Sequence, residues 1–161
     1  MKSRILLCIF ILCLFADQVC IYYGLNEYRF VTKLSLVPLL LVHYLTSSLS
    51  KNSFFVFGLV FSFLGDLFLL FEWGFLFGLG SFFLAHIFYI LCFKQFKISK
   101  PKKLILVLGI YITLLIWILY PYLNEMKIPV ILYGIVISTM LYFAVATKDK
   151  MLIVGAILFE N

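Results

Sequence analysis

The sequence has few charged residues for its length. Only 12% of its 161 residues are Asp, Glu, Lys or Arg, whereas 65% are hydrophobic and 19% are aromatic. A soluble domain carries about a quarter of its residues as charges, because it must cover its surface with polar groups. The composition therefore excludes an ordinary soluble domain.

Familiar motifs of soluble enzymes are also missing. The sequence has no P-loop, no HExxH, no glycine-rich phosphate loop and no Ser-His-Asp order. Its four cysteines lie in apolar runs, without a CxxC pair or metal-ligand spacing, so we expect buried thiols. We expect no metal and no cofactor. These absences exclude only the familiar soluble chemistries, because sites inside membranes are seldom visible as local motifs.

Long apolar runs make up most of the sequence. They approach the ~20 residues that a helix needs to cross ~30 Å of hydrocarbon, and they are continuous, not alternating as in a barrel strand. The sequence predicts an all-α, polytopic transmembrane helix bundle that forms a single membrane domain over residues 1–161. We expect full helices at about 5–25, 30–46, 53–71, 73–93, 104–120 and 128–146.

The positive charges predict the orientation of the chain. With a cytoplasmic N-terminus and six crossings, ten of the 13 basic residues fall on the cytoplasmic side. The other three are Arg29, Lys33 and Lys127. This bias follows the positive-inside rule. The net charge of +6 is therefore interpreted as loop charge that sets topology, and not as a nucleic-acid surface.

Both ends of the sequence need separate interpretation. The first run could be a signal peptide, but Leu14 and Ala16 form only half of a small-x-small cleavage pattern, so we favour a retained helix. A partial seventh helix at 151–159 would reach about halfway across the hydrocarbon. A carboxyl terminus beside Glu160 would be costly at that depth. Either this segment lies in a protein interior or the functional protein continues beyond Asn161, and we favour the second.

Asp66 is the outstanding polar residue. It lies thirteen residues after Ser53, within SFLGDLFLL, and a charge deep in a membrane costs about 3 kcal/mol or more, so it should face protein and not lipid. Small and polar residues, Ser62 among them, share its helical face. We expect Asp66 to act as a general acid. The alternative is a structural aspartate, hydrogen-bonded to Ser62 or to another helix.

Two further polar residues lie in other predicted helices. Asp17 lies toward the outer end of the first run, where it could pair with Lys33 or Arg29 or share a cavity with Asp66. His86 lies at the edge of a face of small residues in the fourth run. A neutral histidine can lie in a membrane at low cost, so structural and functional roles are equally open for it. We expect His43 to be structural.

Two segments resemble a known family. FVFGLVFSFLGDLFLLF and GFLFGLGSFFLAHIFYI are similar to the paired helices of the YhhN family, the lysoplasmalogenases. TKLSLVPLLL, IPVILYGIVISTM and MLIVGAILF resemble other family segments, so the likeness reaches nearly the whole chain. Two positions differ from the family pattern: Leu34 follows Lys33 where the family has proline, and Glu160 follows Phe159 where it has Ser-Asp.

The resemblance implies a hydrolase in a bacterial inner membrane that cleaves the vinyl-ether bond of lysoplasmalogens into an aldehyde and a glycerophospho-alcohol. Asp66 would donate a proton to the alkenyl group, and Asp17 would stabilise the cation or orient water. Its partners would be a lysophospholipid substrate and membrane lipids, without nucleic acid. The residues expected to bind substrate are His86, Tyr89, Ser62 and Lys33.

Two other interpretations stay open. Asp66 and His86 could relay protons in a small transporter or channel, because intramembrane acids and histidines also mark proton pathways. The inverted repeats typical of transporters are not convincing in this sequence. The chain could also be an inactive, truncated family member.

Overall fold

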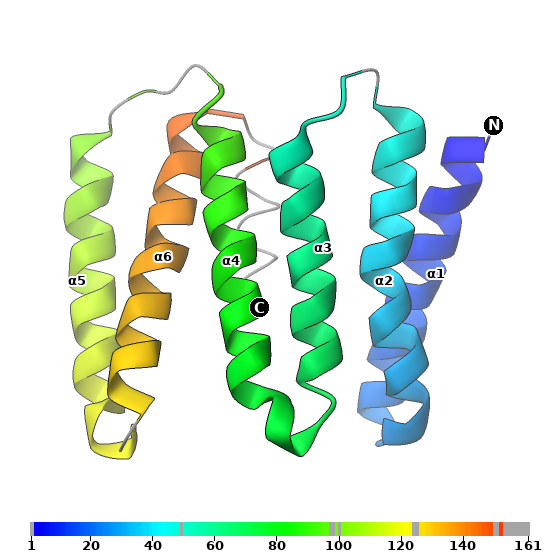
Figure 1. Cartoon of the computed structure of the whole chain (residues 1–161), viewed down its shortest axis with the longest axis horizontal. Coiled ribbons are helices and arrows are strands. Elements are labelled where there is room, and N and C mark those ends of the chain that lie inside the picture. Colours follow the sequence, from blue (N-terminus) through cyan, green and yellow to red (C-terminus); the bar gives the residue numbers. More distant parts are fainter. Residues whose placement is uncertain are drawn as a thin grey trace. The chain divides into compact units, whose positions relative to one another are not determined.

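The computed structural model describes residues 2–48, 50–96, 99, 101–123, 126–149 and 152. Over these residues the chain forms six α-helices and two short 3-10 helices, with no strand (Figure 1). The α-helices are α1 (Lys2–Tyr22), α2 (Asn26–Ser47), α3 (Ser53–Phe68), α4 (Phe75–Phe93), α5 (Lys102–Leu119) and α6 (Lys127–Ala146). The 3-10 helices are η1 (Glu72–Gly74) and η2 (Tyr120–Tyr122). The predicted all-α fold class is confirmed.

Five of the described helices are long and apolar enough to cross a membrane, namely α1, α2, α4, α5 and α6. The exception is α3, which has 16 residues. At 1.5 Å per residue it spans about 24 Å, somewhat less than a typical hydrocarbon core. The described part of the chain therefore has the six apolar helices that the sequence predicted, of which five are long and apolar enough to cross a membrane and α3 is shorter. The partial seventh helix lies outside the described residues, apart from Leu152.

Local chemistry explains where the first and third helices begin and end. Gly24 has a φ of +67°, which favours glycine and ends α1 at Tyr22, before the predicted end at residue 25. The Asn52 side chain caps α3 by accepting hydrogen bonds from the backbone N–H groups of Phe54 and Phe55. The same helix ends at Phe68, before the predicted end at residue 71.

The chain divides into two compact units, Met1–Ala85 and His86–Asn161, with the boundary inside α4. In the first unit, α2 contacts both α1 and α3. The start of α4 packs closely on α3: a Cβ atom added at Gly65 would lie 2.7 Å from the Phe82 ring, and one added at Gly78 would lie 2.8 Å from the Leu69 side chain. These glycines therefore allow close helix packing.

In the second unit, α5 contacts α6, and the segment after α4 is held by the end of α6. The backbone N–H and the hydroxyl of Ser99 both donate to the Ala146 carbonyl oxygen, at 2.7 and 2.9 Å. The Lys94 ammonium lies 5.9 Å from the centre of the Phe143 ring. The two hydrogen bonds from Ser99 satisfy a carbonyl at the C-terminus of α6, where carbonyls lack partners within the helix.

Candidate functional site

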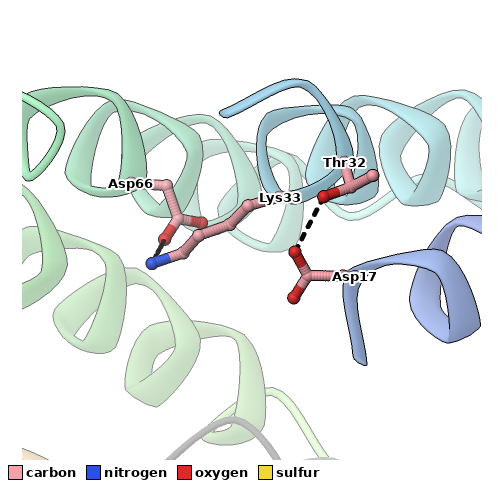
Figure 2. A network of polar contacts seen from close by, with 4 residues as sticks. All are labelled: Asp17, Thr32, Lys33 and Asp66. Carbon is pink, nitrogen blue, oxygen red and sulfur yellow. Dashed lines mark hydrogen bonds and ion pairs between the residues drawn. The ribbon is translucent and has the colours of Figure 1, made fainter. Parts of the chain in front are cut away.

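An ion pair joins α2 to α3. The Lys33 Nζ atom lies 3.3 Å from the Asp66 Oδ1 atom, and Figure 2 shows the two side chains extending toward each other. The lysine side chain is 37% exposed and the aspartate side chain 16%. A charge within an apolar helix is costly unless it is paired, and this pair supplies each group with a partner of opposite charge.

A second carboxylate joins α1 to α2. The Thr32 hydroxyl donates a 2.8 Å hydrogen bond to the Asp17 Oδ1 atom (Figure 2). Asp17 is only 7% exposed. A buried carboxylate needs such donors, because its desolvation is expensive without them.

The structure gives Lys33 a partner that the sequence did not single out. The sequence suggested that Lys33 could pair with Asp17; the structure shows Lys33 paired with Asp66, while Asp17 accepts a hydrogen bond from Thr32. The reason is helical geometry: consecutive residues of a helix point about 100° apart, so Thr32 turns toward α1 and Lys33 toward α3. The side chain of Arg29, the other expected partner, lies outside the described part of the structure.

The three charged residues lie near the same end of the first three helices. The α1–α2 and α3–α4 turns are both at the bottom of Figure 1. Asp17 precedes the end of α1 by five residues, and Lys33 follows the start of α2 by seven. At 1.5 Å per residue these distances are about 8 and 10 Å. Asp66 is two residues from the end of α3, so it lies nearer a helix end than the predicted helix of residues 53–71 implied.

An apolar turn follows Asp66. Leu69, Leu70, Phe71 and Trp73 are all exposed. The rings of Phe71 and Trp73 stack with their centres 5.4 Å apart, and aromatic residues are typical of the boundary between hydrocarbon and headgroups. We therefore interpret the turn as interfacial, with Asp66 just beneath it.

Ser62 lies one turn before Asp66 on α3 and is 1% exposed. Its hydroxyl donates a 2.8 Å hydrogen bond to the Gly58 carbonyl oxygen of its own helix. Back-bonding of this kind is a common way for serine to satisfy its hydroxyl in an apolar helix. A role for Ser62 in substrate binding stays a prediction.

His86 and Tyr89 belong to the second unit. His86 is 1% exposed and its ring meets that of Tyr133 edge to face, with the ring centres 5.4 Å apart. Tyr89 is 6% exposed. The contact links α4 to α6 within this unit, and a substrate-binding role for His86 and Tyr89 stays a prediction.

Sequence reasoning missed Thr32. A hydroxyl beside a lysine in an apolar run was the available signal, because a polar pair on adjacent positions can serve two neighbouring helices at once.

No three His, Cys, Asp or Glu side chains within the described ranges lie close enough to hold a metal ion.

The cluster of Asp17, Thr32, Lys33 and Asp66, which we call the charged cluster, combines two carboxyls with one ammonium and one hydroxyl. Each carboxyl is held by one of two adjacent α2 residues, Asp66 by Lys33 and Asp17 by Thr32. Lys33 is the most exposed of the three ionisable members. The arrangement can exchange protons through a carboxyl and attract an anion through the ammonium.

The apolar helices and their internal charged cluster define a polytopic membrane protein with a polar site among its helices. The chain belongs to the YhhN family, whose sequence model matches residues 28–160. That range includes Lys33 and Asp66 and begins after Asp17. The comparison with curated proteins gave no match, and neither did the comparison with solved structures.

Proposed function

We propose that this protein is a membrane hydrolase that cleaves the vinyl-ether bond of lysoplasmalogens into an aldehyde and a glycerophospho-alcohol. The observation that carries the proposal is the charged cluster, in which α2 brings Lys33 to Asp66 and Thr32 to Asp17. Membership of the YhhN family is compatible with this activity.

The position of the cluster along the helices supports a lipid substrate of this kind. In a lysoplasmalogen the vinyl ether joins the alkenyl chain to glycerol, so it lies where hydrocarbon gives way to headgroup. Asp17 and Lys33 lie about 8–10 Å from the ends of their helices. A lipid held among these helices would bring its reactive bond to a similar depth, with its phosphate at the Lys33 ammonium, which reaches Asp66 near the end of α3.

The chemistry needs a proton donor and a water molecule. The carboxylic acid of Asp66 donates its proton to the β-carbon of the alkenyl group, which forms an oxocarbenium ion. Water adds to the α-carbon and returns a proton to the Asp66 carboxylate. The hemiacetal then collapses into the aldehyde and the free glycerol hydroxyl, so that one water is consumed and no oxidant is needed.

Asp17 supplies the second carboxyl of the mechanism. Its carboxylate is proposed to stabilise the oxocarbenium ion or to orient the attacking water, and its burial and its hydrogen bond from Thr32 support this role. Ser62, His86 and Tyr89 are the further residues proposed to bind the lipid. Lys33 is proposed to bind its headgroup.

Aldehyde release tests the proposal. The purified chain in lipid nanodiscs is given a lysoplasmalogen with a choline headgroup, and aldehyde is measured for wild type, Asp66→Asn and Asp149→Asn. Asp149 is an exposed aspartate after α6 and serves as the matched control. Loss of a general acid lowers rates by about 10²–10⁴-fold, so Asp66→Asn should lose nearly all activity while Asp149→Asn keeps it.

Other outcomes decide between the alternatives. Full activity of Asp66→Asn would exclude Asp66 as the acid. Proton flux into liposomes without aldehyde release would support a proton-relay transporter, and no aldehyde and no flux would support an inactive chain.

A further inference from the structure

The charges of the cluster determine how its protonation must change when an anion binds. With both carboxyls ionised, Asp17 and Asp66 carry two negative charges, and Lys33 carries the single positive charge. A phosphodiester that binds at Lys33 adds one more negative charge. Uncompensated charge is expensive in a low-dielectric setting, and like charges at short distance disfavour one another's ionised forms.

Lys33 is the most exposed charged residue of the cluster. The Lys33 side chain is 37% exposed, Asp66 16% and Asp17 7%. An ammonium has three donor hydrogens, and the structure shows one carboxylate oxygen of Asp66 at 3.3 Å. The ammonium of Lys33 is therefore the charged group of the cluster most accessible to an anionic headgroup.

We propose that Lys33 is the receptor for the phosphate of the lipid, and that it exchanges Asp66 for that phosphate as Asp66 takes up one proton from water. The inference rests on the proposed function for the identity of the lipid, a lysophospholipid. In this scheme the ammonium keeps a partner of opposite charge throughout. The carboxyl that loses its partner becomes neutral, so the net charge of the cluster stays constant.

The exchange gives Lys33 a positioning role. The acid form of Asp66, which the hydrolysis needs, arises only when a phosphate-bearing lipid occupies the site. Water entering without substrate meets an ion-paired carboxylate that has no proton to donate. Binding and activation are thereby linked through one residue.

The ionisable groups whose contacts the structure shows in the cluster come from three helices. Asp17 joins it from α1, Lys33 from α2 and Asp66 from α3. Residues 75–85 of α4, which pack on α3 through Gly78 and Phe82, contain no ionisable side chain. Asp66 and Asp17 are the two carboxyls whose contacts with Lys33 and Thr32 the structure shows, so a test must separate them and must also include Glu72 of the following turn.

Proton uptake on binding is the direct test, and it needs no turnover. The probe is a short-chain saturated alkyl-ether glycerophosphocholine, which has no vinyl ether to hydrolyse and a headgroup that does not titrate. The protein is placed in weakly buffered solution at neutral pH, and an indicator dye records protons taken up per lipid bound. The control ligand is the alkylglycerol of the same chain, which lacks the phosphate.

We expect about one proton taken up per phospholipid bound and none with the alkylglycerol. Asp66→Asn should bind the phospholipid without uptake, whereas Asp17→Asn and Glu72→Gln should each keep most of it. Lys33→Met should bind the phospholipid about tenfold to hundredfold more weakly, since a hydrogen bond between charged groups is lost. Lys33→Arg should restore both affinity and uptake.

Several results would overturn the inference. Binding of the phospholipid without proton uptake would exclude the exchange, and so would uptake that persists in Asp66→Asn or equal affinity of Lys33→Met. The hydrolase proposal fails separately: normal proton uptake together with no aldehyde from a lysoplasmalogen would leave an anion-binding site without that reaction.

Discussion

Removal of the Lys33–Asp66 ion pair should destabilise the first unit by an amount that a double-mutant cycle can isolate. The pair has an N–O distance of 3.3 Å and side chains 37% and 16% exposed. Fully exposed pairs contribute about 0.2–1 kcal/mol, and removing one partner of a buried pair costs about 3–5 kcal/mol. This partly exposed pair lies between those limits. We expect Lys33→Met and Asp66→Asn each to lower the free energy of unfolding by about 1–2 kcal/mol.

The double variant should lose less than the sum of the single variants, because the second substitution removes a group that has already lost its partner. The expected coupling free energy is about 1 kcal/mol. Unfolding is followed in mixed micelles of increasing SDS content by far-UV circular dichroism. Lys51→Met replaces an exposed lysine before α3 and should change stability by less than about 0.5 kcal/mol.

The double-mutant cycle can also show that Lys33 and Asp66 do not interact. If the single-variant losses add to within about 0.3–0.5 kcal/mol in the double variant, Lys33 and Asp66 do not interact in the membrane-embedded protein. The charged cluster would then lose the contact that joins α2 to α3.

Two further predictions use matched substitutions. Thr32→Val removes a 2.8 Å hydrogen bond to the buried Asp17 carboxylate, so we expect the free energy of unfolding to fall by about 1.5–3 kcal/mol in the same assay. The control is Thr113→Val, which should be nearly neutral because the Thr113 hydroxyl is exposed and bonds a carbonyl of its own helix. Equal losses in the two variants would contradict this account. Gly74→Ala would press a methyl group against a backbone carbonyl at the end of α3 and should cost about 1–3 kcal/mol. Gly80→Ala in α4 meets open space, so a similar cost there would show that the cost at Gly74 does not come from its close contact with α3.

The helices were largely predictable because their signal is local. Each apolar run of near-membrane length became a helix, and the errors fell where a single residue or contact ends one. Gly24 ends α1 through its left-handed backbone conformation. The C-terminus of α3 is different: its apolar pattern continues through Leu69 and Leu70, but the chain turns there and packs Gly74 against the Phe68 carbonyl. Periodicity alone could not show that turn.

The candidate site was predictable in part. Asp66, Asp17 and Lys33 stood out from the sequence because charged groups are expensive inside apolar helices. The contacts that these residues make did not stand out from the sequence. Lys33 could have faced either neighbouring helix, and Thr32 carried only a weak signal. Both pairings depend on α2 contacting α1 on one face and α3 on another.

The sequence alone determined that the chain is helical, that it belongs in a membrane and that its few internal charges need partners. These properties follow from residue-by-residue transfer free energies and from the backbone hydrogen bonds that lipid requires. Only the tertiary structure decided that Lys33 pairs with Asp66 and that Thr32 holds Asp17. That choice depends on which helix faces pack together, and packing joins residues far apart in the chain that no local pattern relates.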